Sequence, residues 1–226
     1  MEGLATEIDY CGLGEIQKVI DSLKKHGVDK AVMAGKVHKK ALYEGFNPDA
    51  RAMRMLAGLK DMKDDSLLLA VVGELESEGI RIMDSTVLMP GAVPGKGCLT
   101  KRQPTAAEQG DIEFGYSTAK TIAGMDIGQT VIVKDKSVLA VESIEGTDET
   151  VRRGGSYGKS GCVMVKVSKP NQDFRFDMPV IGPYTVKTAV ESGISCIAID
   201  AGASIILNRS EAISSADESG VCITAV

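Results

Sequence analysis

The chain has 226 residues, which is long enough to bury the core of one large domain or of two small ones. Its formal net charge of −5 argues against a nucleic-acid partner, because such proteins normally carry basic patches. With 43% hydrophobic and 25% charged residues it has an ordinary globular composition, and no apolar run is long enough to cross a bilayer. The start lacks a basic-then-apolar signal segment, so the sequence predicts a cytoplasmic protein.

The N-terminal part alternates short strands with helices. The first helix is expected at 15–25, where apolar residues recur at helical spacing, and Gly27 ends it. Further helices are predicted at 49–59 and 64–77, and strands at 7–10, 30–34 and 80–83. A strand, a helix and a second strand in succession favour a parallel sheet.

Residues 89–97 differ in composition from everything before them. Two prolines and three glycines lie within these nine residues, which is typical of a connecting segment. We therefore expect an N-terminal α/β domain at 1–84, a linker at 85–96 and a C-terminal α/β domain at 97–226.

The C-terminal part begins with one long helix at 105–125, where Thr105 and Glu108 have the spacing of a capping box. A β-hairpin follows, in which two runs rich in Val, Ile and Leu flank a turn at 135–137. We expect a strand at 204–207 to pair with one at 196–199 across Gly202. The other predicted elements are strands at 162–168, 178–181 and 221–224, and helices at 185–192 and 209–218.

These elements predict an α/β fold made of two α/β domains. The N-terminal domain is expected to be a parallel-sheet, Rossmann-like domain that lacks its first βα unit, because no strand–glycine–helix turn precedes its first helix. The C-terminal domain, expected to carry the catalytic residues, should hold a mixed sheet with helices. Cys162, Cys196 and Cys222 lie in apolar, strand-like runs and are interpreted as buried small hydrophobic residues.

The segment 142–153 combines acids with a basic pair at the junction of a strand and a helix. Glu142, Glu145 and Asp148 precede Arg152 and Arg153. Carboxylates suit a hard metal ion, and guanidinium groups bind phosphate oxygens bidentately. The segment therefore favours a site for a metal and phosphates, with solvated turn acids as the alternative for Glu142 and Glu145.

Polar residues near other strand ends are further candidates. Thr147 is compatible with two roles, as the N-cap of the following helix or as a contact to a phosphate at the helix start. Gln129 begins the hairpin, where it could bond a sugar or uracil. Lys166 and Lys169 flank a strand end and could reach phosphates as point charges. Lys36 follows a predicted strand, where α/β sheets place ligands; a turn or surface position without a ligand is the alternative for each.

Three motifs occur in order along the chain: DIGQ at 126–129, EGTDETVRR at 145–153 and DMPVIG at 177–182. Together with the earlier segment HGVDKAVMAGKV, they resemble the LpxI-type UDP-2,3-diacylglucosamine pyrophosphatases of lipid A biosynthesis. The resemblance covers the chain from about residue 12 to its C-terminus. It implies metal-dependent hydrolysis of the pyrophosphate bond in UDP-2,3-diacylglucosamine, which gives UMP and 2,3-diacylglucosamine 1-phosphate.

The resemblance also implies residue roles. The aspartate that matches Asp177 has a metal-binding role in that family, so Asp177 is the first catalytic candidate, together with Asp148, Arg152 and Arg153. The alternative for Asp177 is an aspartate that bonds to loop backbone near the start of a strand. Mg²⁺, or another divalent cation such as Mn²⁺, is expected at Asp177, Glu142 and Glu145. The substrate-binding candidates are Lys36, Gln129, Thr147, Asp148, Lys166 and Lys169.

The expected partner is the UDP-linked diacylated glucosamine, with peripheral contact at the cytoplasmic face of the inner membrane and a homodimer as the assembly. Relatives in this family begin with a βα unit that carries a glycine-rich turn, and the start of this sequence does not match it. Because such a turn binds anions at a helix N-terminus, the alternative is a catalytically inactive module that binds a nucleotide or phospholipid.

Overall fold

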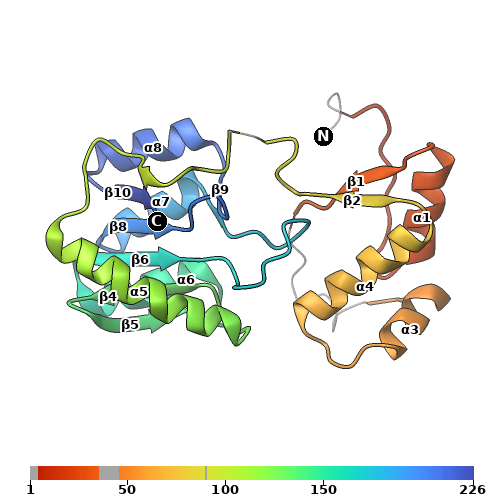
Figure 1. The fold of residues 1–226 in the computed structure, drawn as a ribbon, viewed down its shortest axis with the longest axis horizontal. Helices are drawn as coiled ribbons and strands as arrows, with labels where there is room; N and C mark the ends of the chain where they lie inside the picture. Colours follow the sequence, from red (N-terminus) through yellow and green to blue (C-terminus); the bar gives the residue numbers. More distant parts are fainter. Residues whose placement is uncertain (1–4, 36–45, 90) are drawn as a thin grey trace. The chain divides into compact units, whose positions relative to one another are not determined.

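The computed structural model describes residues 5–35, 46–89 and 91–226. The chain divides into two compact units, Met1–Ser85 and Thr86–Val226, each with its own secondary structure (Figure 1). The two α/β domains expected from the sequence are confirmed. None of the described helices is both long and apolar enough to cross a membrane.

The first unit packs three described helices around a small sheet. Strands β1 and β2 pair in parallel, as the strand–helix–strand succession predicts. Arg51 on one helix pairs with Glu74 and Glu78 on and after another, at 2.5 Å and 2.7 Å. The prediction of a strand at 7–10 is wrong, because those residues are described and have no strand hydrogen bonding. The elements are α1 (Ile16–Lys25), β1 (Lys30–Val32), α3 (Ala50–Ala57), α4 (Asp64–Ser77) and β2 (Arg81–Met83).

The second unit is built on a six-stranded mixed sheet with the order β3-β10-β8-β6-β4-β5. Strands β6, β8 and β10 run parallel, whereas β4 runs antiparallel to β5 and β6, and β3 antiparallel to β10. The elements are β3 (Gly97–Cys98), α5 (Ala106–Gly124), β4 (Thr130–Lys134), β5 (Ser137–Val141), α6 (Thr147–Gly158), β6 (Cys162–Lys166), β7 (Val180–Ile181), α7 (Pro183–Glu191), β8 (Ile194–Ile199), β9 (Ile205–Ile206), α8 (Arg209–Glu218) and β10 (Cys222–Ala225).

Two apolar layers form the core of this unit, one on each face of the sheet. Helix α5 covers one face with Ile112, Ala119 and Ala123, and α6, α7 and α8 cover the other (Figure 1). Because successive side chains of a strand point to opposite faces, strands covered on both faces are mostly apolar, and Lys166 at the end of β6 and Thr224 in β10 are buried polar exceptions. The prediction that three strand cysteines are buried is confirmed for Cys162, Cys196 and Cys222.

The prediction that 204–207 pairs with 196–199 is wrong. Strand β9 instead pairs in parallel with β7 in a separate two-stranded sheet, and the amide of Ile205 donates to the Pro179 carbonyl at 2.8 Å. The physical reason is that β8 is a central strand. Its two hydrogen-bonding edges are already taken by β6 and β10, so a third partner has no edge to join.

Part of the predicted linker lies against the second unit. The Ile206 amide donates to the Ala92 carbonyl and the Gly202 amide to the Pro94 carbonyl, both at 2.8 Å. The Arg209 guanidinium donates to the Gly91 carbonyl at 3.1 Å. Residues 91–94 are therefore fixed to the loops and helix start that follow β8.

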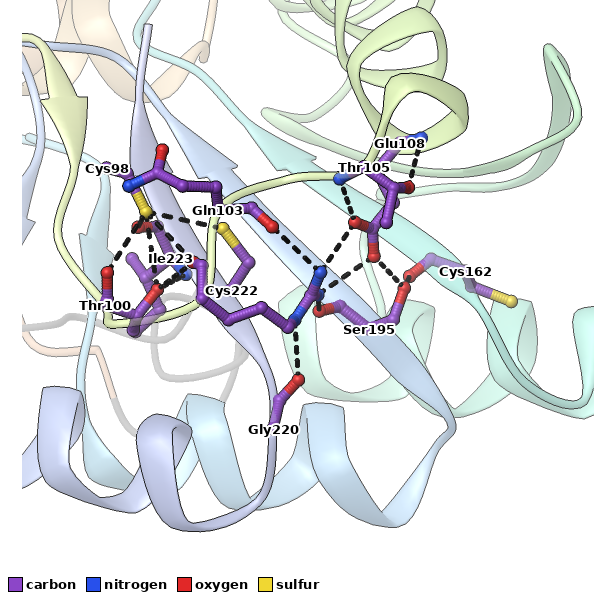
Figure 2. A network of polar contacts seen from close by, with 11 residues as sticks. Cys98, Thr100, Gln103, Thr105, Glu108, Cys162, Ser195, Gly220, Cys222 and Ile223 are labelled. Atoms are coloured by element: carbon purple, nitrogen blue, oxygen red, sulfur yellow. Dashed lines mark hydrogen bonds and ion pairs between the residues drawn. The ribbon is translucent and has the colours of Figure 1, made fainter.

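A polar network lies at the end of the sheet where the parallel strands β8 and β10 begin (Figure 2). Arg102 donates two parallel hydrogen bonds to Glu108, at 2.8 Å and 2.9 Å, and also donates to the Ser195 and Gly220 carbonyls. The predicted capping box is confirmed: the Thr105 side chain accepts from the Glu108 amide, and Glu108 accepts from the Thr105 amide. This network ties the start of α5 to the start of β8.

Candidate active site

Lysine, acidic and hydroxyl side chains lie together at the opposite end of the same sheet, where the parallel strands β6 and β8 end. Lys166 is the last residue of β6 and lies across from Thr130, the first residue of β4. Glu142 directly follows β5, and Asp200 directly follows β8. The carboxyl edge of parallel strands is where α/β sheets bind ligands, so this edge is the candidate site.

Lys166 is the centre of the first cluster at this edge. The side chain is buried, with 7% of the residue exposed, and its ammonium donates to the Thr147 hydroxyl at 2.8 Å and to the Thr130 hydroxyl at 3.2 Å. The Glu142 carboxylate lies 3.6 Å away and accepts a hydrogen bond from Thr147 at 2.7 Å. Thr147 thus bridges the cation and the anion of a buried pair.

Glu142 stays ionised in this cluster. Burial by itself would raise the pKa of its carboxyl, but the Lys166 ammonium and the surrounding hydrogen-bond donors outweigh burial and hold that pKa below its usual range. Among the described residues, nothing donates a hydrogen bond to the buried Glu142 Oε2 or to the buried Gln129 Oε1. Buried acceptors normally have a donor. Glu142 Oε2 lies 3.6 Å from the Lys166 ammonium, and both oxygens are covered by protein atoms, so a ligand could bond to them only after neighbouring side chains move.

Lys169 is the centre of the second cluster, in the loop after β6. Its ammonium lies 2.8 Å from Asp126 and 3.5 Å from Asp177. Both aspartates have a left-handed backbone, with φ of 59° and 55°, and the Asp177 side chain is exposed. Aspartate tolerates that conformation better than most residues, and such backbone strain concentrates at functional sites.

Asp200 and Lys120 form a third cluster that the sequence analysis missed. The buried Asp200 carboxylate accepts from the Lys120 ammonium at 2.5 Å and from the Ser168 amide at 2.7 Å. One sequence signal could have found it: Asp200 is an acid placed directly after the apolar run of β8. Lys120, in the middle of a long helix, gives no such signal.

Helix α6 places the predicted basic pair on its exposed side. Arg152 pairs with Glu149 at 2.6 Å and donates to the Tyr184 hydroxyl, whereas Arg153 pairs with Glu145 at 2.5 Å. Both guanidinium groups are reachable from solvent, and their role toward phosphate stays a prediction.

The start of α6 excludes the N-cap role of Thr147, and its contact to a phosphate stays a prediction. The N-cap of α6 is Gly146, with φ of 84°, and Thr147 is the first helical residue. The N-cap interpretation of Thr147 is therefore wrong, because its hydroxyl is engaged with Lys166 and Glu142 instead. Asp148 lies in the first turn of the same helix. Lys36, the remaining candidate, lies outside the described residues.

The three predicted metal ligands do not form a preassembled carboxylate site. In residues 5–35, 46–89 and 91–226, no group of three or more His, Cys, Asp or Glu side chains is arranged to hold a metal ion. Glu142, Glu145 and Asp177 are instead each paired with a different cation. Asp177 has the most exposed side chain of the three and lies beside Lys169, and a carboxylate of this kind suits Mg²⁺ when substrate phosphates supply further oxygens.

Comparison with known proteins identifies relatives of the whole chain. The profile of the LpxI N-terminal domain matches residues 1–92, and that of the LpxI C-terminal domain matches residues 95–224. The chain is similar to the UDP-2,3-diacylglucosamine pyrophosphatase LpxI of Caulobacter vibrioides, with 33% identity over 227 residues. That alignment covers 95% of this chain and 80% of the relative.

Proposed function

This chain belongs to the LpxI family, and we propose that it hydrolyses the pyrophosphate bond of UDP-2,3-diacylglucosamine to UMP and 2,3-diacylglucosamine 1-phosphate. The name of the Caulobacter vibrioides relative supports the substrate and the reaction. One observation in this chain carries the proposal. Lys166 and Lys169, at and just after the C-terminal end of β6, lie beside acids and hydroxyl groups.

The two lysines are proposed to hold the pyrophosphate. Hydrolysis places additional negative charge on the phosphate that leaves, and cations fixed in a partly dry site stabilise that charge better than water does. Lys166 is already oriented by Thr130 and Thr147, so it is positioned before the substrate arrives. Thr147 and the N-terminus of α6 are proposed to contact a phosphate oxygen, and the Asp148 carboxylate to accept from an adjoining sugar hydroxyl.

Asp177 is proposed to hold the divalent cation together with substrate phosphates. Mg²⁺ or Mn²⁺, when bound, neutralises phosphate charge and activates the attacking water. The Lys169 ammonium lies 3.5 Å from the Asp177 carboxylate, and we propose that this ion pair holds the carboxylate in place for the cation. Glu142 and Glu145 are paired with cations, and we propose that they orient Lys166 and Arg153 rather than complete a set of three metal ligands.

The polar groups around the lysines are proposed to recognise the rest of the nucleotide. Gln129 Oε1 and Glu142 Oε2 accept no hydrogen bond from the described residues, and we propose that they accept from N–H or O–H groups of uracil or of a sugar once substrate binding moves the side chains that cover them. Arg152 and Arg153 are exposed on α6 and are proposed to bind phosphate oxygens as the substrate docks.

Apolar side chains exposed close in sequence to these clusters support the lipid part of the proposal. Ile144 lies between Glu142 and Thr147 and is 93% exposed. Phe174 and Tyr184 are exposed on either side of Asp177 in sequence. Exposed apolar residues of this kind mark lipid or protein contacts, so we propose that they meet the acyl chains or the inner-membrane surface. Homodimer formation stays a prediction.

The test is release of UMP from UDP-2,3-diacylglucosamine, measured with Mg²⁺ and with excess chelator. We expect metal-dependent release that falls at least about 100-fold in Lys166→Met, because a buried cation at the reacting phosphate is lost. Lys134→Met is the matched control, since Lys134 bonds the Gly158 and Ser160 carbonyls at the other end of β4. Binding of UMP without any release would refute the proposal in favour of the inactive binding module. Release that persists in chelator would refute the metal dependence alone.

A further inference from the structure

The carboxylate of Asp200 binds Ser168, which lies in the loop that follows β6. Asp200 is 3% exposed, and its Oδ2 accepts from the Ser168 amide at 2.7 Å, the Ser168 hydroxyl at 2.6 Å and the Lys120 ammonium at 2.5 Å. Ser168 is itself buried, so these contacts are made away from water. Charge-assisted hydrogen bonds of this kind are short and strong.

Lys120 also bonds to Ser168. Its ammonium donates to the Ser168 carbonyl and to the Ser168 hydroxyl, each at 3.0 Å. The amide, the carbonyl and the hydroxyl of Ser168 are thus all bonded by one ion pair, in which Asp200 is buried and Lys120 is partly exposed. Tyr116 lies under Lys120, with its ring centroid 5.5 Å from the ammonium, and burial together with Asp200 raises the pKa of Tyr116 to about 12.

The residue after Ser168 is Lys169, whose ammonium pairs with Asp126 and Asp177. We propose that Asp200, with Lys120, is a positioning residue that holds the Ser168–Lys169 segment so that Lys169 faces the pyrophosphate and Asp177. This inference rests on the proposed function and adds two residues that the motifs of the sequence do not contain. Asp200 acts through Lys169 and touches no substrate.

A purely structural role explains the pair less well. Burying the Asp200 carboxylate costs desolvation free energy that its ion pair seldom more than offsets, so stability alone gives little reason to place the charge here. The pair also lies at the functional edge of the sheet and bonds all three polar atoms of the residue before Lys169. Rigid support by neighbouring hydrogen bonds is what a charged group needs in order to act on a transition state.

The first experiment compares Asp200→Asn with a matched control at the other edge of the sheet. Glu108→Gln is that control, because Glu108 is also buried and paired with a cation, Arg102, but lies away from Lys169. We expect Asp200→Asn to lower kcat by about 10- to 100-fold with KM within about threefold, since a displacement of about 1 Å has costs of this order. Glu108→Gln should lower stability and leave the kcat of the folded protein unchanged. Equal kcat in Asp200→Asn and wild type would overturn the inference.

A double-mutant cycle with Lys169→Ala separates positioning from general damage. If Asp200 acts through Lys169, then Asp200→Asn should cost less than about twofold in a chain that already carries Lys169→Ala. Full additivity of the two losses would refute the inference, because it would mean that Asp200 acts independently of Lys169. Ser168→Ala, which removes only the hydroxyl, is the milder variant if Asp200→Asn folds poorly, and a smaller loss that also disappears beside Lys169→Ala is expected.

Hydrogen exchange of the Ser168 and Lys169 amides gives a readout that does not depend on turnover. Asp200→Asn should speed exchange at these amides, whereas Glu108→Gln should not. A wild-type protein that releases no UMP contradicts the proposed function. Faster exchange of the Ser168 and Lys169 amides in Asp200→Asn would still support the inference that Asp200 holds this segment. Unchanged exchange at these amides in Asp200→Asn would refute the inference that Asp200 holds this segment, whether or not the wild type is active.

Discussion

The Arg102–Glu108 pair makes a quantitative prediction about acid stability. Glu108 accepts two hydrogen bonds from Arg102, one from the Ser195 hydroxyl at 2.6 Å and one from the Thr105 amide at 2.8 Å (Figure 2). The substitution Glu108→Gln keeps the size of the side chain and removes its charge. We expect this variant to unfold more easily at neutral pH, because Arg102 and Ser195 lose their anionic partner.

The size of the effect follows from the pKa of Glu108. Burial opposes ionisation, but the hydrogen bonds from Arg102 and Ser195 outweigh it and lower the pKa from 4.5 to about 2. That difference corresponds to roughly 3 kcal/mol of folding free energy, since each tenfold change in proton affinity is worth about 1.4 kcal/mol. Because the folded pKa is the lower one, the stabilisation is complete above the unfolded value of 4.5 and is lost as the pH falls through about 2.

The assay is urea unfolding of the wild type and of Glu108→Gln at a series of pH values from 7 to 2.5. Hydrogen exchange at α5 and β8 should accompany it, because the two units of the chain can unfold separately. We expect a difference of roughly 3 kcal/mol at pH 7, falling to less than half of that by pH 3. A difference that does not change with pH, or no difference at pH 7, would refute the reasoning.

Three further predictions concern the proposed metal ligand Asp177, a close backbone contact and the thiols. Asp177→Ala should lower UMP release at least about 100-fold with nucleotide binding retained in calorimetry, and normal turnover would contradict the assignment. In Gly155→Ala the new Cβ would lie 2.0 Å from the Ser192 carbonyl oxygen, so α6 must shift. We expect a loss of about 1–3 kcal/mol in denaturant unfolding, and an unchanged midpoint would show that the backbone yields freely. Maleimide should label the exposed Cys11 in the folded chain and the buried Cys222 only after unfolding; mass spectrometry that finds equal rates would contradict the burial.

Elements specified by local signals could be predicted from the sequence. The turn at 135–137 joins β4 and β5 as expected, and both turn residues Asp135 and Lys136 have positive φ. The capping box at Thr105 and Glu108 starts α5 as predicted, because its two hydrogen bonds link residues only three apart. Such signals depend on neighbours in the chain and need no knowledge of the rest of the fold.

Contacts between distant segments could not be predicted in the same way. Strand β9 pairs with β7 because β8 is already paired on both sides, and this depends on the order of the whole sheet. Asp200 meets residues 32 and 80 positions away, Ser168 and Lys120, so no spacing in the sequence announces them. Lys166 could be proposed from its position at a strand end, but its burial and its bridge through Thr147 to Glu142 appear only when β4, β5, β6 and α6 are brought together.

Ion pairs lie at both ends of the second unit's sheet, Glu108–Arg102 where β8 begins and Glu142–Lys166 where β6 ends, and they differ in whether their hydrogen-bonding atoms are satisfied. At the start of β8, Glu108 is satisfied by Arg102, Ser195 and Thr105, and every contact ends within the network. At the carboxyl edge, Glu142 retains a buried oxygen without a donor among the residues the structure describes. A network that is fully satisfied can only stabilise the fold, whereas an unsatisfied acceptor beside a buried lysine has lower free energy once a ligand donates to it. Substrate binding should therefore raise the unfolding temperature of the wild type, and Glu142→Leu should reduce this shift more than Glu108→Gln does.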